Sequence, residues 1–212
     1  METKENGYYD IELDLELDTA SGLLTDIFAV KDLKQRKLFL NADIDQWNVE
    51  DVVKHILQFN KEDKGKPIEE RQPIILYVTS NGGSVDAGFE VIDSICTSKT
   101  PVYTINLGFQ YSMGFLIGIA GHKRYAMKNA RFLMHDGSSF AWDSSAKLQD
   151  QMEFQRRAEQ RIKRYIMEHS NVTEKEYEDK YRVEWYMFAD EAKERGFVDY
   201  IIGEDCDIDE II

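Results

Sequence analysis

One serine lies where a chain could use it as a nucleophile. Ser112 interrupts the stretch Leu107–Gly121, LGFQYSMGFLIGIAG, whose other residues are mostly apolar or small. The unbroken apolar run that follows, 115–120, is typical of a buried helix. The hydroxyl would then lie at the first turn, where helix N–H groups are unpaired and an oxyanion can bind. The same position also suits a serine that only caps the helix, so both readings stay open here.

A second candidate site is the glycine turn at 80–84, Ser-Asn-Gly-Gly-Ser, between a strand pattern and a helix pattern. The adjacent Gly82 and Gly83 permit positive φ or a close approach of backbones. One reading is a backbone N–H donor for an anion at the entrance of the helix. The other is a tight turn without chemistry. The G-x-G-x-x-G spacing is missing, which argues against a dinucleotide loop.

Composition limits the kind of protein that this chain can be. The chain has 212 residues, 42% of them hydrophobic and 12% aromatic, which suits one packed domain with an appendage. Its net charge of −14 argues against nucleic acid or an anionic membrane as the main partner. Cys96 and Cys206 have no metal-ligand spacing and fit a reducing compartment. With no signal peptide or long apolar run visible, we expect a soluble, cytoplasmic protein without metal or cofactor.

Between the candidate sites the chain alternates strand and helix patterns. Apolar, β-rich runs predict strands at 37–41, 73–79, 101–107, 123–126, 131–134 and 197–202. Apolar spacing of three and four residues predicts helices at 47–59, 85–97, 143–170 and 189–195, and a cap signature at Thr173 predicts a shorter one before Lys180. We interpret this order as parallel βαβ units in an α/β fold.

The two ends of the chain and its longest helix have separate interpretations. Residues 9–18, YDIELDLELD, alternate apolar and acidic side chains and predict a strand, with Leu23–Val30 returning as the second strand of a hairpin. Residues 203–212 hold five acidic side chains and no base, so we expect both ends to be solvated.

The 143–170 helix is long for a small domain and suggests a projecting arm that packs on a partner.

Four motifs together resemble the proteolytic subunit of the Clp protease (ClpP). They are YVTSNGGSVDAG at 77–88, YSMG at 111–114, FLMH at 132–135 and ADEAKERGFVD at 189–199. The resemblance covers about 35–202 and implies a crotonase-like ββα spiral with a handle helix at about 143–170. It also implies three parts: an acidic N-terminal hairpin or extension at 1–34, a catalytic domain at 35–202 and an acidic tail at 203–212.

The resemblance also implies serine endopeptidase chemistry. By position, Ser112 matches the nucleophile and His135 the general base, while Gly83 and the N–H of Met113 match the oxyanion donors. The third triad member lies 49 residues after the histidine in the family, which here is Glu184 rather than aspartate. Glutamate has the right charge and is one methylene longer. The resemblance further places substrate beside Gly82, Ser84, Val85 and Asp136.

Several positions depart from the family pattern. Asn81 stands where the glycine turn usually has proline, Asp136 and Gly137 replace Gln-Pro after the histidine, and Val183 replaces an arginine linked to ring contacts. The chemistry positions are thus better kept than the assembly positions, as in a divergent paralogue. A buried Glu184 with only a structural role is an alternative.

The resemblance implies stacked seven-membered rings of this chain, fed with peptide or unfolded protein by an AAA+ Clp ATPase, with the acidic strand near the axial entrance. Two other functions stay open. One is a catalytically weak or inactive subunit that assembles with a partner. The more remote one is a crotonase-type acyl-CoA enzyme, in which Ser112 and His135 would be idle.

Overall fold

The structure, a computed structural model, describes residues 20–137, 145–180 and 182–211. The chain divides into two units, Met1–Gln35 and Arg36–Ile212. Within the described part, no helix combines the length and the apolar character that crossing a membrane requires.

The described part of the first unit is one helix, α1 (Ala20–Lys34). The prediction of a second strand at Leu23–Val30 is therefore wrong. Its apolar residues come in adjacent pairs, Leu23 with Leu24 and Ile27 with Phe28, four residues apart. This is a helical spacing rather than an alternation. The predicted strand at 9–18 lies outside the described residues.

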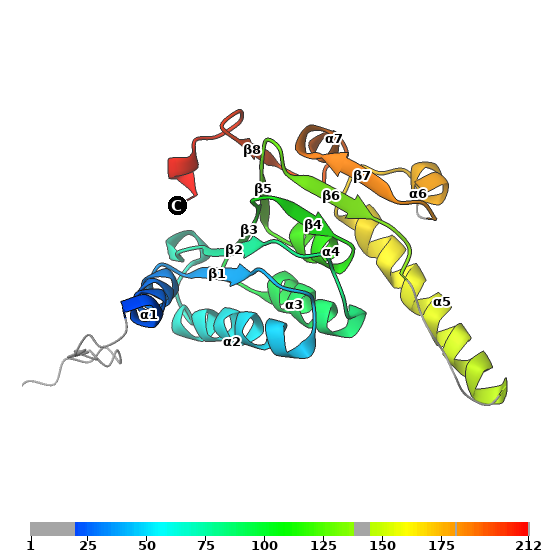
Figure 1. Cartoon of the computed structure of the whole chain (residues 1–212), viewed down its shortest axis with the longest axis horizontal. Coiled ribbons are helices and arrows are strands. Elements are labelled where there is room, and N and C mark those ends of the chain that lie inside the picture. Colours follow the sequence, from blue (N-terminus) through cyan, green and yellow to red (C-terminus); the bar gives the residue numbers. More distant parts are fainter. Residues whose placement is uncertain (1–19, 138–144, 181, 212) are drawn as a thin grey trace, which may run out of the picture. The chain divides into compact units, whose positions relative to one another are not determined.

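The second unit is built on a parallel sheet of five strands in the order β1-β2-β3-β5-β8 (Figure 1). Its strands are β1 (Lys37–Leu40), β2 (Ile74–Val78), β3 (Val102–Asn106), β5 (Lys123–Met127) and β8 (Tyr200–Ile202). Each lies within or overlaps a predicted strand, so the βαβ interpretation is confirmed. The burial of alternate residues, as in Ile74, Leu76 and Val78 of β2, shows that one face of the sheet carries the main core.

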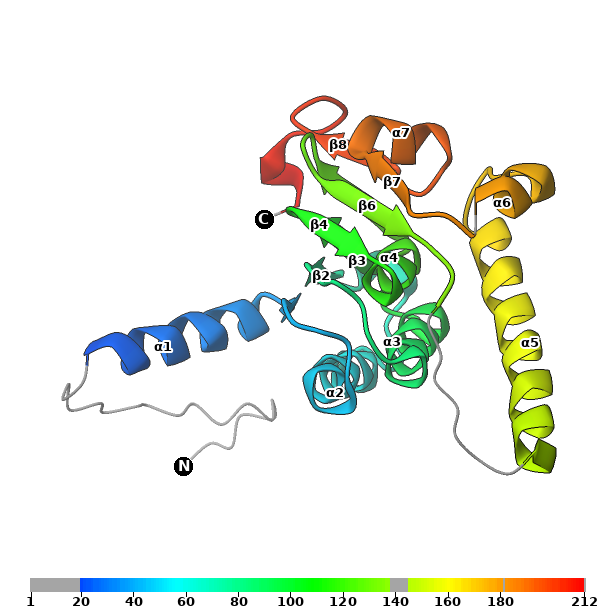
Figure 2. The same ribbon diagram turned by 45° about the vertical axis from the view of Figure 1, so that its right-hand side comes forward.

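Helices cover that face. They are α2 (Gln46–Glu62), α3 (Val85–Thr97) and the buried α4 (Met113–Ile119). The first two lie side by side under the sheet (Figure 2). Asp45 begins α2 by accepting hydrogen bonds from the N–H groups of Trp47 and Asn48. The bounds of α3 coincide with the prediction, because its apolar face is buried at regular helical spacing.

The opposite face of the main sheet also carries an apolar cluster. Ile105, Tyr125 and Ile202 are buried there, and Ile211 packs on them just after the short 3-10 turn η2 (Ile208–Glu210). The prediction of a solvated C-terminal end is thus wrong for Ile211, which is 4% exposed. The acidic residues around it stay in water while the apolar side chain turns inward.

A second, three-stranded sheet has the order β4-β6-β7. Its strands are β4 (Phe109–Tyr111), β6 (Arg131–Met134) and β7 (Trp185–Phe188). The β4–β6 pairing is parallel and the β6–β7 pairing is antiparallel. Only β6 was predicted as a strand, and no strand was predicted for β4 or β7.

The remaining elements are a short turn between α2 and β2 and three helices in the C-terminal half of the chain. They are the 3-10 turn η1 (Ile68–Glu70), the long helix α5 (Ser145–Glu168), α6 (Glu174–Lys180) and α7 (Ala189–Glu194). The prediction of a long helix and a shorter one after it is confirmed. The C-terminal end of α5 is anchored on α4, because the Tyr165 hydroxyl donates to the Leu116 carbonyl at 2.8 Å. Burial raises the pKa of Tyr165 well above its usual value, which keeps the phenol a neutral donor. The other end projects away from the sheets (Figure 1).

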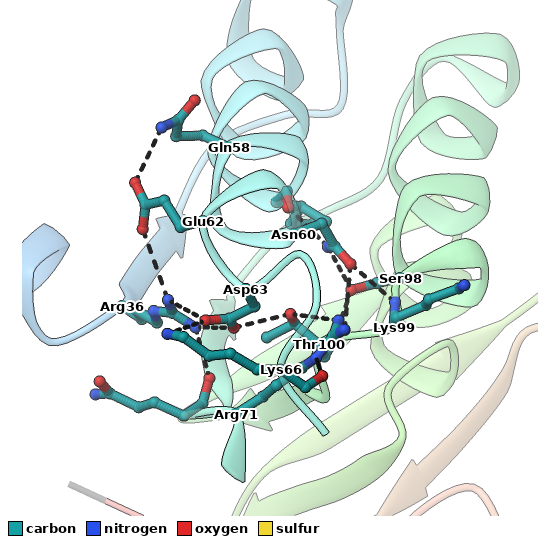
Figure 3. Close-up of polar contacts among 12 residues, drawn as sticks. Arg36, Gln58, Asn60, Glu62, Asp63, Lys66, Arg71, Ser98, Lys99 and Thr100 are labelled. Carbon is teal, nitrogen blue, oxygen red and sulfur yellow. Dashed lines mark hydrogen bonds and ion pairs between the residues drawn. The ribbon is translucent and has the colours of Figure 1, made fainter. Parts of the chain in front are cut away.

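A buried ion pair ties β1 to the end of α2 (Figure 3). Both nitrogens of the Arg36 fork donate to the Asp63 carboxylate, which is fully buried and also accepts from Lys66 and Thr100. The hydrogen bonds from Arg36 hold the pKa of Asp63 far below its usual range. Removing one partner of such a pair leaves the other charge buried without compensation, which strongly destabilises the fold.

We predict that Asp63→Asn lowers the free energy of unfolding by about 3 kcal/mol at pH 7. Because the pKa of Asp63 is depressed in the folded chain, its contribution is present above about pH 4 and is lost as the pH falls further. The difference between wild type and variant should therefore shrink below pH 4 in urea unfolding experiments. Glu50→Gln, which removes an exposed pair with Lys54, is the control and should change little. An equal loss at pH 3 and pH 7 would contradict the prediction.

Candidate active site

The register of one antiparallel ladder brings two predicted site residues together. In the β6–β7 pairing Met134 lies opposite Trp185, so the next residues outward are His135 and Glu184. Their side chains meet, with 3.0 Å between His135 Nδ1 and Glu184 Oε1. Two residues that are 49 positions apart in the sequence thus occupy one cross-strand position. Glu184 is 57% exposed, so the burial that the structural alternative assumed is wrong.

Ser112 is held at the same end of the small sheet by the other ladder. Tyr111 of β4 pairs with Leu133 of β6, and the Ser112 N–H donates to the Leu133 carbonyl at 2.9 Å. Ser112 is the N-cap residue of α4, yet its side chain makes no capping hydrogen bond. Its φ of 51° lies in a region that residues other than glycine rarely adopt. A strained serine between a strand and a helix is the geometry of a nucleophile elbow, so capping does not explain this serine.

The glycine turn approaches this serine closely. Gly82 has a φ of +102°, and a Cβ on it would lie 2.7 Å from Ser112 Cβ and 3.0 Å from Met113 N. Only glycine fits such an approach without a shift of the backbone. The turn therefore lies directly against Ser112 and the first residue of α4.

Backbone pairing directs the Gly83 N–H toward the open side of this turn. Ile44 donates to the Gly82 carbonyl at 2.8 Å and accepts from the Ser84 N–H at 2.7 Å, so the polar groups of Gly83 point the other way. The Met113 N–H is in the first turn of α4, where no helical acceptor exists. Neither N–H has an acceptor within the described part of the chain. Two free donors, one next to Ser112 in the chain and one from the glycine turn, can stabilise an oxyanion.

A pocket of about 70 Å³ lies beside Ser112. Ser112, Met113 and His135 line it, together with two of the predicted substrate residues, Val85 and Asp136. Its other walls come from α4, α5 and α6 and are mainly apolar: Phe115, Leu116, Ile162, Ile166 and Tyr177. The pocket thus places apolar surface next to the candidate nucleophile and base.

The other two predicted substrate residues do not line the pocket. Ser84 begins α3, where its hydroxyl accepts from the Ala87 N–H at 3.3 Å, and Gly82 lies against Ser112 as described. No hydrogen bond between Ser112 and His135 is present in the described residues. Such contacts are often long in free enzymes and shorten when substrate binds.

Sequence reasoning missed the contribution of α5 to this pocket. Glu159, Ile162 and Ile166 line it from one face of the helix. Their spacing of three and four residues was visible in the sequence. It predicted a helix, but not which neighbour that face would meet.

Comparison with known proteins identifies the family of this chain. The sequence model of the Clp protease family matches residues 24–205. The chain belongs to the Clp protease family. It is 33% identical over 190 residues to ATP-dependent Clp protease proteolytic subunit 1 of Streptomyces avermitilis, covering 88% of this chain and 84% of that protein.

Two further relatives extend the comparison. Proteolytic subunit 3 of Streptomyces coelicolor is 34% identical over 200 residues, 91% of this chain and 87% of its own length. Proteolytic subunit 2 of Treponema pallidum is 29% identical over 185 residues, 86% of this chain and 89% of its own length. The resemblance predicted over 35–202 is confirmed, and so are the ClpP fold and the assignment to a serine peptidase family.

Gly82→Ala tests whether the close contact between Gly82 and Ser112 matters, as distinct from the positive φ that glycine permits. We predict that this variant folds but reacts at least about tenfold more slowly with a fluorophosphonate probe, because the new Cβ displaces Ser112. Gly65→Ala is the matched control. Gly65 also has positive φ, at +91°, but a Cβ there meets nothing within 4 Å. Equal labelling rates of the two variants, both with wild-type circular dichroism, would refute the prediction.

Proposed function

We propose that this chain hydrolyses peptides and unfolded polypeptides with Ser112 as nucleophile, His135 as general base and Glu184 as the acid that orients the histidine. The observation that carries the proposal is the His135–Glu184 hydrogen bond, at the edge of the pocket that Ser112 lines. A carboxylate on Nδ1 fixes the tautomer in which Nε2 is free to accept a proton.

In the acylation step Ser112 Oγ attacks the peptide carbonyl and its proton passes to His135. The carbonyl oxygen becomes an oxyanion, which the N–H groups of Gly83 and Met113 stabilise, each by about 3–4 kcal/mol in sites of this kind. His135 then gives the proton to the leaving amine. Water, activated by the same histidine, releases the acyl group. A substrate strand beside 83–85 would present its backbone to this turn by β-addition.

Assembly is part of the proposal. The projecting end of α5 exposes two large apolar side chains, Met152 at 58% and Phe154 at 63%, which suits contact with another copy of the chain. We propose that copies form seven-membered rings, one or two, enclosing the active sites, and that an AAA+ Clp ATPase delivers substrate. Cys96 and Cys206 are free thiols, which fits a cytoplasmic location.

The alternatives are less well supported. A weak or inactive subunit was suggested by Glu184 in place of aspartate and by Val183 in place of arginine, yet Glu184 contacts the histidine at hydrogen-bond distance. An acyl-CoA enzyme would leave Ser112 without a use, although its backbone is strained and its side chain caps nothing.

Ser112→Ala should abolish both peptidase activity and fluorophosphonate labelling, because the attacking oxygen is gone. Both are measured on the full-length chain with a fluorogenic peptide and a fluorescent probe. Ser84→Ala, which removes a hydroxyl from the neighbouring turn, should still be labelled. Labelling of the Ser112→Ala protein would rule out this nucleophile.

Glu184→Gln should lower kcat by about 10²–10⁴-fold, because an amide neither fixes the tautomer nor stabilises the imidazolium. Glu184→Asp should lower kcat about tenfold, since the shorter aspartate side chain leaves a gap to His135 that the glutamate side chain spans. Glu204→Gln, another exposed carboxylate, pairs with Lys128 and serves as the control. A Glu184→Gln enzyme with wild-type kcat would remove Glu184 from the mechanism.

A further inference from the structure

The mouth of the active-site pocket is acidic. Asp136 and Glu159 line it, and Glu184 adds a third carboxylate through its contact with His135. No lysine or arginine is among the described residues that line the pocket. The pocket lining therefore combines apolar walls with two carboxylates and no basic side chain of lysine or arginine.

Glu159 lies at the open end of a graded helix face. Ile166 is buried at 2% exposure, Ile162 is half-buried and Glu159 is exposed. Three residues of α-helix span about 4.5 Å, so the step from Ile162 to Glu159 takes the pocket wall from apolar to acidic within the reach of a long side chain. Lysine and arginine have this character, with an aliphatic stem and a cationic end.

Lys163, which has the spacing to pair with Glu159, forms ion pairs with α6 instead. Lys163 follows four residues later on α5, the spacing at which a glutamate and a lysine usually pair. Lys163 instead donates to Glu174 and Glu178 of α6, the former at 2.9 Å. These contacts raise the pKa of Lys163 and keep it charged. Glu159 has no ion pair or hydrogen bond within the described part of the chain.

We propose that Glu159 determines specificity by selecting substrates with lysine or arginine on the acyl side of the cleaved bond. That residue carries the carbonyl that Ser112 attacks, so its side chain is the one that enters the pocket. Its stem would contact Ile162 and its cation would lie at Glu159. This inference rests on the proposed function and names a substrate class for the same site.

The test compares two fluorogenic peptides that differ only in this residue, lysine or methionine, which are similar in length. The full-length wild type should have a higher kcat/KM for the lysine peptide. Glu159→Gln should reduce the lysine-to-methionine ratio about threefold to fivefold, mainly through KM, as expected for a partly exposed ion pair. Glu159→Lys should reduce it further. Glu153→Gln, an exposed position on the same helix outside the pocket lining, is the matched control and should keep the wild-type ratio.

The outcomes separate the two proposals. An unchanged ratio in Glu159→Gln, with normal labelling of Ser112, would overturn the role of Glu159 alone. A wild type that prefers methionine would do the same. Failure of the wild type to cleave either peptide or to react with the probe would overturn the proposed function, and the inference would fall with it.

Discussion

The site depends on the register of the β6–β7 ladder. Because side chains alternate across a strand, a shift of one residue would turn either His135 or Glu184 to the opposite face of the sheet. The pairing of Met134 with Trp185 sets that register, and both residues are buried. The parallel β4–β6 pairing then brings Ser112 to the same edge. Backbone hydrogen bonds of one small sheet thus bring three residues from distant parts of the sequence to the same edge.

The strained serine needs rigid surroundings to keep its conformation. The helix that follows Ser112 is buried at every residue from Met113 to Ile119. Phe115 lies at its centre, with ring centroids 4.9 Å from Phe197 and 6.3 Å from Phe132. This aromatic contact joins α4 to β6, the strand that precedes His135. The packing that fixes Ser112 therefore also fixes the strand that leads to His135.

The sequence predicts these elements unevenly, for physical reasons. Long buried strands and amphipathic helices have a clear period, which is why α3 was predicted with its bounds. Strands such as β4 have three residues and no period, and their pairing is a long-range property. The family spacing of 49 residues was enough to select Glu184 as a candidate. Its contact with His135 could be seen only once the register of the β6–β7 pairing was known. The isolation of Glu159 depends on Lys163 pairing with α6, which no local pattern shows.

Two electrostatic effects of different range act on a substrate of this chain. The net charge of −14 attracts any cationic polypeptide, but charges in water are screened beyond about 8–10 Å at physiological salt. A carboxylate that lines the pocket acts within contact distance and is screened less. Added salt should therefore weaken the general attraction more than the discrimination between lysine and methionine. Selection of a residue at the cleaved bond is thus a local property of the α5 face, whereas capture of substrate is a property of the whole chain.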